Sequence, residues 1–464
     1  MTPPIRASRW RRAFSRPLAR AATGFLALVA LCAVYAPLVA SGHPLAMTDA
    51  ATGERSFPLL AHLSSLDILL ATTVTLGLLW VALPGKASRR DKAVSSLMVI
   101  AVAVFTAAVA NGFAEATYRR DAAPWMRELA FVPFAVSLLA ALLACTIALL
   151  AVRSRWPASR QGALVLIAIA GAFLCTWRWT TPPETYPYEA QRRAGEVTLT
   201  STLVPFSPAQ RPTDRNERLL PPMTRTIVAN DDATTHTYPA HLLGTDEDGR
   251  DVLSQLIHAC RVALTVGFVA TGVAFSVGVL LGALMGYFGG WVDTVLMRLV
   301  EVFMSLPVLF VLIVAAGIFP RSVLTMAALI GLFSWQSVAR LVRAEFLALR
   351  EADFVSAARA QGVPRSSVLF RHLLPNGVAS AIVDASFTVS AAILAEAVLS
   401  YLGFGPVDRA SWGRLLAQAV SETGGLVPHL AFIPGLMIFA TVLSANAIGT
   451  AANEALNPNA EAGP

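Results

Sequence analysis

Two acidic side chains, Asp384 and Glu396, stand within one long apolar run of this sequence, residues 377–402. An ionisable group inside a membrane is costly, so it normally faces a cavity, a partner or a substrate path. Their spacing places them about 120° apart around a helix axis, so they cannot form a catalytic dyad. Either acid could line a path and meet the ammonium group of a substrate. For Asp384 we favour the alternative, a hydrogen bond within the helix bundle. For Glu396 the alternative is a position near the outer interface, and both interpretations stay open.

No other set of side chains has the spacing of a known catalytic or metal site. The seven His and four Cys show no ligand spacing. Residues 246–249 resemble the start of a calcium loop, but Ile257 occupies the twelfth position, where an EF-hand needs Glu. Residues 85–87 lack the earlier Gly and the hydroxyl of a nucleotide-binding loop. We therefore expect no catalytic residue, metal or cofactor. An intramembrane enzyme is kept only as an alternative class of protein.

Composition indicates a multi-pass membrane protein. Hydrophobic residues make up 55% of the 464 residues and charged residues only 14%, whereas soluble proteins carry about 25% charged residues. The net charge of +7 does not indicate nucleic acid, because the Arg residues cluster beside apolar runs and so orient the chain at a lipid surface. The four scattered Cys are interpreted as small buried apolar residues.

The apolar runs predict an all-α integral membrane protein with about ten transmembrane helices. They lie at about 21–41, 63–84, 93–114, 129–152, 161–179, 262–288, 296–319 (interrupted by Pro307), 322–341, 377–402 and 428–450. Residues 1–20 hold six Arg and no acid, which places the N-terminus in the cytoplasm. Residues 180–258 contain no spanning run, and we expect an extracytoplasmic segment with weak order through about 235. The count of spans then puts both termini in the cytoplasm.

Two local patterns predict packing around the second half of the chain. Thr245 or Asp246 caps a predicted helix that lies on the membrane surface. Farther along, Gly278, Gly282 and Gly286 follow one another at every fourth position. This spacing makes a smooth stripe on one helix face, which membrane helices use for close approach to a neighbour.

An Arg-rich polar stretch, residues 340–376, separates two late apolar runs. It is too polar for hydrocarbon, and its Arg residues place it on the cytoplasmic side. We predict a short helix over 351–361, ended by Gly362 in a left-handed conformation and blocked by Pro364. A second helix is expected from about Arg365 to near Pro375. Two helices that meet at a Gly form a rigid unit suited to transmitting movement.

Within this stretch, Ala357-Ala358, Gly362 and the run 372–375 resemble the EAA loop of ABC-importer permeases, and the ending RHLLPN resembles their dipeptide/oligopeptide branch. The resemblance implies that residues 342–375, here named the coupling loop, dock in a cleft of a partner ATPase. Ser356 stands where the family has Glu, so that contact falls to another charged residue or is absent. The alternative is an amphipathic loop without a partner. The residues carried over are Glu351, Asp353, Ser356, Ala357, Ala358, Arg359, Gly362, Arg371, His372 and Pro375.

Other segments resemble the same family in the right order. Residues 35–40 resemble the end of its first helix, residues 243–254 its LGTDxxGRDVLS signature, and residues 395–403 and 411–413 two later motifs. Trp412, in the last of these, is predicted to anchor at the membrane interface rather than to pack against a binding protein. The predicted domains are residues 1–58 with the first span, 59–179 as a four-helix insertion, 180–258 with a surface helix, and 259–458 as the permease core.

The resemblance implies a type I ABC-importer permease in the inner membrane of a bacterium, driven by ATP hydrolysis on partner subunits. Its implied partners are a second permease, two ABC ATPases, an extracytoplasmic solute-binding protein and membrane lipid. The implied cargo is di- or oligopeptides. Residues 42–45 and 57–60 resemble the sub-branch that imports long peptides and microcin C. Nickel or glutathione is the alternative cargo, and a non-importing, signal-coupled membrane subunit is the alternative class.

Overall fold

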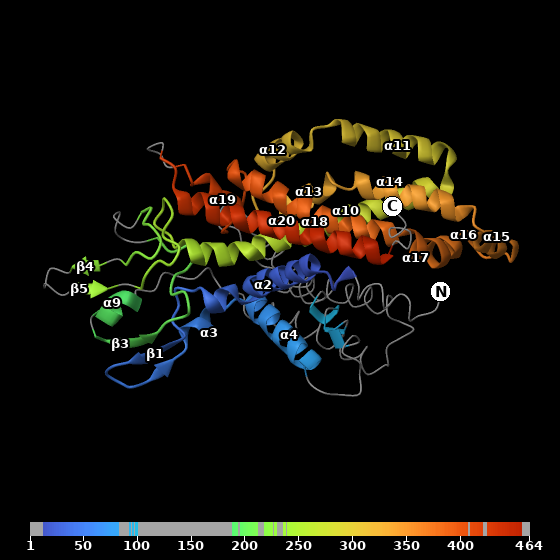
Figure 1. Ribbon diagram of the computed structural model, residues 1–464. Coiled ribbons are helices and arrows are strands. Elements are labelled where there is room, and N and C mark those ends of the chain that lie inside the picture. The colour runs from blue at the N-terminus through green and yellow to red at the C-terminus, as the bar shows by residue number, and fades with distance from the viewer. Residues whose placement is uncertain are drawn as a thin grey trace, which may run out of the picture. The chain divides into compact units, whose positions relative to one another are not determined.

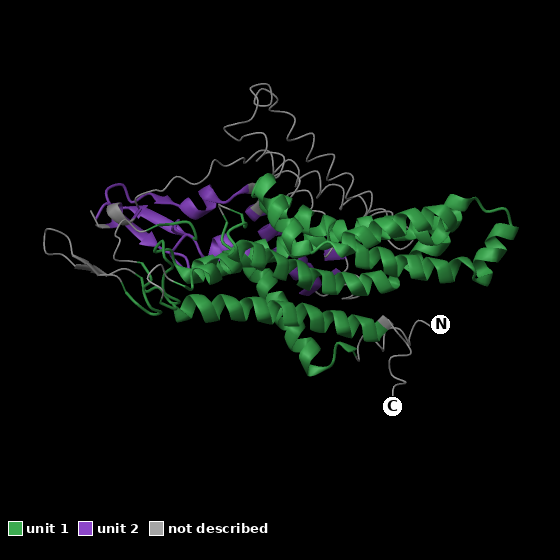
Figure 2. Cartoon of the chain, turned by 90° about the horizontal axis from the view of Figure 1, so that it is seen from above, with its two compact units in different colours: residues 1–33, 208–464 green, residues 34–207 purple. Residues whose placement is uncertain are grey.

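The structure is a computed structural model, and its described part is mainly helical (Figure 1). The chain forms two compact units, residues 34–207 and the remainder, coloured separately in Figure 2. Most of the predicted spans 93–114, 129–152 and 161–179 lies outside the described residues. The described residues are 13–82, 92–93, 95–96, 98–100, 188–193, 195–211, 218–225, 227–229, 235–237, 239–406, 409–420 and 425–456.

The larger unit is built from long apolar helices. Four described helices are long and apolar enough to cross a membrane, and two bent helix pairs raise this number to as many as six. The four are α2 (Pro17–Val39), α10 (Val252–Phe288), α18 (Ala379–Tyr401) and α20 (Pro428–Leu456). The bent pairs are α11 (Gly290–Ser305) with α12 (Val308–Ile318), at 84°, and α13 (Val323–Leu332) with α14 (Gln336–Arg350), at 44°.

Six of the predicted apolar runs coincide with these four helices and two bent pairs. The predicted interruption at Pro307 is confirmed, because this residue lies at the sharp bend and caps the start of α12. A proline cannot continue the hydrogen-bond ladder of a preceding helix. The bend between α13 and α14, at residues 333–335, was not predicted, since no proline marks it.

Glycines bring α10 and α14 together. A Cβ built at Gly278 would lie 2.6 Å from the Cβ of Val338, and one at Gly282 would lie 2.5 Å from the carbonyl oxygen of Ala339. Gly286 meets Phe346 in the same way, at 2.4 Å between the two Cβ positions. Residue numbers increase in the same direction along both sides of this contact, so α10 and α14 run parallel. The predicted glycine stripe is confirmed as a close-packing face.

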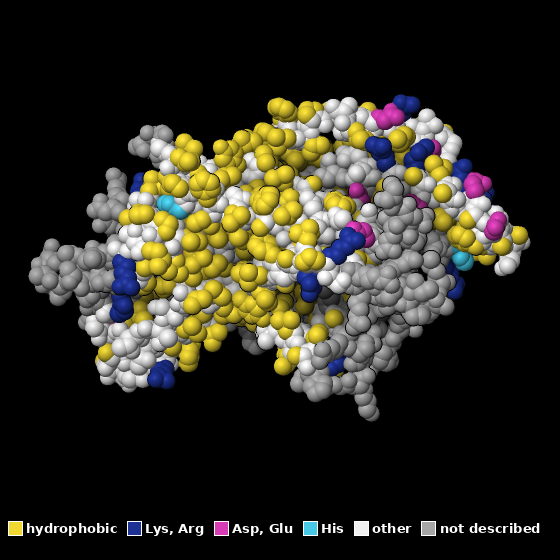
Figure 3. Space-filling view, in the orientation of Figure 1, with side chains coloured by type: hydrophobic (Ala, Val, Ile, Leu, Met, Phe, Trp, Pro, Cys, Tyr) yellow, Lys and Arg dark blue, Asp and Glu magenta, His cyan; other side chains and the backbone are white. Residues whose placement is uncertain are grey.

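Several chain ends meet at one end of the larger unit. Ala19 of α2 is buried with Ala451 and Ala455 of α20, and Gly377, just before α18, lies against the ring of Phe346 near the end of α14. In the space-filling view, apolar side chains cover the middle of the visible face, while charged side chains gather beyond the end of α14 (Figure 3).

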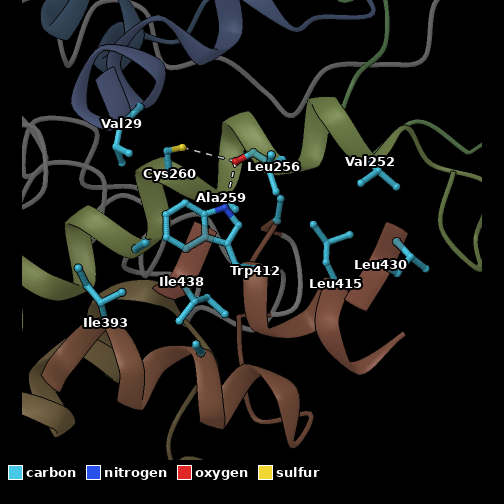
Figure 4. Close-up of a cluster of buried hydrophobic side chains, with 14 of the residues drawn as sticks. Val29, Val252, Leu256, Ala259, Cys260, Ile393, Trp412, Leu415, Leu430 and Ile438 are labelled. Carbon is cyan, nitrogen blue, oxygen red and sulfur yellow. Dashed lines mark hydrogen bonds between the residues drawn. The ribbon is translucent and has the colours of Figure 1, made fainter. Parts of the chain in front are cut away.

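The helix predicted to lie on the membrane surface is instead the beginning of α10, so that expectation was wrong. The cap is Asp251, whose side chain accepts a hydrogen bond from the backbone N–H of Ser254 at 2.7 Å. Val252 and Leu256 do not face lipid, because Trp412 and Leu430 pack on them in a buried apolar cluster (Figure 4). Tertiary cover, rather than a lipid surface, buries this face.

The smaller unit adds strands that the sequence did not predict to a chain that is otherwise mainly helical. It contains an antiparallel sheet of order β2-β1-β3, in which Met47 pairs with Leu199. The alternating residues Val197 to Thr200 suit a strand, because β-branched side chains pack well on a pleated surface. Its described elements are β1 (Ala46–Asp49), β2 (Arg55–Ser56), α3 (Pro58–His62), α4 (Ser65–Ala82), α9 (Tyr188–Arg193) and β3 (Val197–Thr200). A hairpin of β4 (Ile227–Ala229) and β5 (Thr235–Thr237) belongs to the larger unit.

Candidate functional site: the coupling loop and the buried Glu396

The first half of the coupling loop is a short helix closed by a glycine. The helix α15 spans Asp353–Ala360. Gly362 follows with φ of 75°, and Val363 donates its N–H to the carbonyl oxygen of Ala358 at 3.1 Å. Together with the Gly362 N–H bonded to Arg359, this is the Schellman pattern, which satisfies carbonyls left free at a helix end. The predicted left-handed Gly362 is confirmed.

The second half of the loop does not end near Pro375, as the sequence predicted. The helical path continues through α16 (Arg365–Ser367), a π-helical turn (η2, Val368–Leu373) and α17 (Leu374–Gly377). In the wider turn, Leu374 donates its N–H to Leu369, five residues back. Pro375 then enters at the first turn of α17, where no N–H is needed. The side chain of Asn376 satisfies the carbonyl oxygen of His372 at 2.7 Å.

The loop has a buried face and an exposed face. Val355, Ala358 and Leu373 pack with Phe346 in one apolar cluster, so Ala358 belongs to the core rather than to a docking surface. Exposed side chains include Phe354 at 42% and Phe370 at 65%. Solvent-exposed aromatic rings on a charged loop are typical of a protein contact surface. The predicted residues on the exposed side are Glu351, Asp353, Ser356, Ala357, Arg359, Gly362, Arg371 and Pro375, and His372 is half-buried.

The loop is tied to the turn between α10 and α11 by polar contacts that the sequence did not indicate. Arg343 of α14 makes two hydrogen bonds to the carboxylate of Asp293 in α11, and the Nη2–Oδ2 distance is 2.7 Å. Nearby, the Tyr287 hydroxyl donates to the carbonyl oxygen of Arg365 at 3.3 Å. The signal that could have predicted the Asp293–Arg343 pair is an acid and an Arg near the same end of two apolar runs.

Glu396 is buried among hydroxyl groups. It is 1% exposed, and its Oε1 accepts hydrogen bonds from Ser400 at 2.7 Å and from Ser411 at 2.8 Å. Ser411 precedes the short helix α19 (Trp412–Ala417), so this bond ties α19 to α18. Buried polar groups of this kind need such partners, because an unpaired one carries its full desolvation cost. A path-lining role for Glu396 stays a prediction.

Trp412 does not anchor at a membrane interface, and it is not available to a binding protein. The side chain is 1% exposed and lies in the cluster formed by α10, α19 and α20, where its Nε1 donates to the carbonyl oxygen of Leu256 at 3.2 Å (Figure 4). Gly413 is needed beside it, since a Cβ there would lie 2.0 Å from the carbonyl oxygen of Ala397. Both interpretations made from the sequence were therefore wrong.

Asp384 makes the interhelical contact favoured by the sequence analysis. Its Oδ2 accepts a hydrogen bond from the Ser337 hydroxyl of α14 at 3.1 Å. Its side chain is half-buried, and it lies a long way along α18 from Glu396. The two acids therefore have separate surroundings, as their spacing required.

The loop before α10 is a buried polar network. Asp246 accepts the backbone N–H groups of Asp248 and Arg250 and the side-chain amide of Gln255, all at 2.8–2.9 Å. Asp251 also binds the ring of His241, at 2.9 Å. Burial raises the pKa of Asp246, and the hydrogen bonds from Gln255 and from the Arg250 backbone oppose the rise. The acids of the suspected calcium loop thus hold the chain's own donors, which fixes the entry of α10.

Bundled apolar helices, a charged helical loop at one end and a polar network at the other define a multi-pass helical membrane permease. Residues 278–461 match the family described as the inner membrane component of binding-protein-dependent transport systems. The chain belongs to this family, the permease subunits of ABC importers. Such a permease is a membrane subunit without catalytic activity, and it works in a complex with ATPase and substrate-binding components. Its location is the inner membrane.

Three curated relatives are similar to just under half of the chain or less. A glutathione transport system permease protein of Pectobacterium atrosepticum is 35% identical over 220 residues, which cover 47% of this chain and 73% of the relative. An oligopeptide transport system permease protein of Haemophilus influenzae is 34% identical over 219 residues, covering 47% and 70%. A peptidoglycan transport system permease protein of Agrobacterium fabrum is 41% identical over 177 residues, covering 38% and 46%.

Proposed function

We propose that this chain forms, with a second and different permease, the translocation path of an importer for peptides. Two ABC ATPases would bind on the cytoplasmic side and a solute-binding protein on the outer side. Relatives named for oligopeptide, dipeptide and peptidoglycan transport support a peptide cargo. The observation that carries the proposal is the coupling loop, a rigid helical unit that exposes Phe354 and Phe370 beside charged residues.

In this proposal the exposed face of the coupling loop docks on an ATPase. The aromatic rings would fill apolar hollows, and Asp353, Arg359 and Arg371 would form polar contacts around them. Ser356 is exposed and carries no charge, so the contact that relatives make with Glu is reduced here. Ala358, which lies in the core, would hold α15 in shape rather than touch the partner.

The proposed topology has ten spans, with both termini and the coupling loop in the cytoplasm. Pairing of β1 with β3 supports an insertion at residues 59–179, because it brings together the chain before and after that segment. His43 and Tyr188 also meet, with 3.1 Å between the ring Nδ1 and the hydroxyl. The segment could therefore be removed without separating its flanking residues. We include Glu396 and Asp384 as candidates for path-lining residues in another conformation of the permease.

Alternative cargoes follow from the relatives. One relative is named for glutathione, itself a small peptide derivative, and nickel is the other cargo considered. A subunit that couples to a signal rather than importing a solute is the alternative class, in which residues 59–179 would dock another membrane protein. Deleting residues 59–179 separates these possibilities, since retained uptake would make the segment an accessory to transport.

The direct test uses the complete transporter in proteoliposomes, with radiolabelled trialanine as cargo and nickel or glutathione as competitors. Phe354→Ser and Phe370→Ser together should reduce ATPase co-purification and uptake, because they remove the proposed contact rings. Both rings are exposed, so the substitutions should leave the core intact. Phe319→Ser is the matched control: this ring is 50% exposed, at the end of α12 away from the coupling loop. Unchanged ATPase binding in the double variant would contradict the docking proposal.

Orientation has its own measurement. Ser356→Cys places a thiol on the exposed face of α15, which an impermeant maleimide should reach only after the cells are permeabilised. Labelling in intact cells would place the coupling loop outside and remove the basis of the proposal.

A further inference from the structure

The helix α11 is weakly held by its own chain. Val300 is its one buried residue within the described range Gly290–Ser305, and Val295, Val302 and Met304 are more than half exposed. Figure 1 shows α11 running along the outer side of α14. A helix with so few buried side chains takes its position from a small number of specific contacts.

Besides the packing of Val300 in an apolar cluster with Met285 and Ala339, two side-chain contacts join α11 to the α13–α14 pair. Near its end, the ring of Phe303 packs on Phe333 and Trp335, with centroid distances of 5.9 and 5.6 Å. Near its beginning, Asp293 receives two hydrogen bonds from the guanidinium of Arg343. A paired, two-point contact of this kind restrains orientation as well as distance, which a single ion pair does not.

Arg343 is itself rigidly placed. Its neighbours Val342 and Phe346 are fully buried, and a Cβ built at Gly286 would lie 2.8 Å from its carbonyl oxygen. Seven residues later α14 ends at Arg350, and the coupling loop turns into α15. Arg343 thus connects the stem of the coupling loop to the first turn of α11.

We propose that Asp293 and Arg343 are positioning residues for energy coupling: they make α11 follow α14 when the coupling loop moves. This inference rests on the proposed import function. Movement of the loop would reach α14 through the continuous backbone and reach α11 through the ion pair. The bend at Pro307 then leaves α12 free to change its angle to α11. Without the pair, α11 would keep its aromatic contact at the far end and the apolar packing of Val300, Leu296 and Met297, but it would lose its polar link to the stem of the coupling loop.

The charge pair offers a swap experiment with a matched control. Asp293→Asn should leave assembly intact and lower the amount of trialanine imported per ATP hydrolysed, by about fivefold or more if the coupling free energy is typical. The double variant Asp293→Arg, Arg343→Asp should restore that ratio, because it rebuilds the pair with reversed charges. Glu301→Gln removes an exposed ion pair to Arg298 within α11 itself and should leave the ratio unchanged.

A distance measurement reports the same movement without any cargo. Spin labels at Val295 of α11 and Ala348 of α14, both exposed, are introduced into a complex whose permease has its four native Cys replaced by alanine. The label distance should be the same with and without ATP in the wild-type pair, and it should change with ATP in Asp293→Asn.

The outcomes separate the two proposals. A wild-type complex that shows neither uptake nor ATPase stimulation would overturn the import function. If the wild-type complex transports but Asp293→Asn imports the normal amount of trialanine per ATP, the role of the pair is overturned. A label distance that changes with ATP in a transporting wild-type complex would overturn it as well. Failure of the charge swap to restore the ratio would do the same, provided that the swapped protein assembles.

Discussion

The glycine stripe of α10 makes a quantitative prediction for Gly282. Replacing it by alanine puts a methyl group 2.5 Å from the carbonyl oxygen of Ala339 and 2.8 Å from the Cβ of Val342. Favourable carbon contacts need about 3.5–4.0 Å, so α10 and α14 must move apart by about 1 Å. The obstacle is backbone, which no rotamer change can relieve. Overpacking of this kind costs about 1–3 kcal/mol.

Gly272 is the control, because it lies on the same helix with nothing within 4 Å of a built Cβ. Alanine there should stabilise the protein by about 0.4–1 kcal/mol, since it restricts the unfolded chain. Both substitutions make the same change of helix propensity, so their difference isolates the packing cost. That difference corresponds to roughly 2–12 °C in melting temperature, at about 2–4 °C per kcal/mol.

The assay is thermal unfolding of the purified permease in detergent, followed by reaction of buried thiols with a maleimide fluorophore. Cys260 lies on α10 and is 2% exposed, in the cluster with Trp412, so its reaction reports unfolding of the helix bundle as a whole. Gly282→Ala should label at a lower temperature than the wild type, and Gly272→Ala at the same or a higher temperature. If Gly282→Ala melts at or above Gly272→Ala, the close approach of α10 and α14 is refuted.

Three further predictions concern single sites. Gly362→Ala forces a residue with a Cβ into φ of 75°, which should cost about 1–2 kcal/mol and speed hydrogen exchange in α15; unchanged exchange would contradict the Schellman ending. Ser411→Ala removes one donor from buried Glu396 and should cost about 1–3 kcal/mol in thermal stability, whereas Ser276→Ala, whose hydroxyl bonds its own helix, should cost much less. Because burial raises the pKa of Asp246 in the folded protein, its protonated form is favoured by folding; this contribution is fully present below the ordinary carboxyl pKa and is lost as pH rises through the raised value. As the pH is raised, the melting temperature of Asp246→Asn should therefore fall less than that of the wild type. Parallel pH profiles of the two proteins would refute the raised pKa of Asp246.

Much of the helical core could be predicted from the sequence, because the signals are local. Long apolar runs determine where helices span, Pro307 marks the sharp bend, and Gly362 followed by Pro364 marks the end of α15. Spacing alone also identified the close-packing glycines. Each of these features depends on residues within a few turns of one another, so the printed sequence contains the whole argument.

Contacts between distant segments were decided only by the tertiary structure. Trp412 looked like an interface residue until α10 and α20 covered it, and the strand pairing of 46–49 with 197–200 joins segments far apart in the chain. Asp293 carried no signal by itself, because its meaning depends on Arg343, fifty residues later. Sequence patterns determine which residues can enter a membrane or end a helix, whereas the partner of a buried polar group is determined by which helices pack side by side.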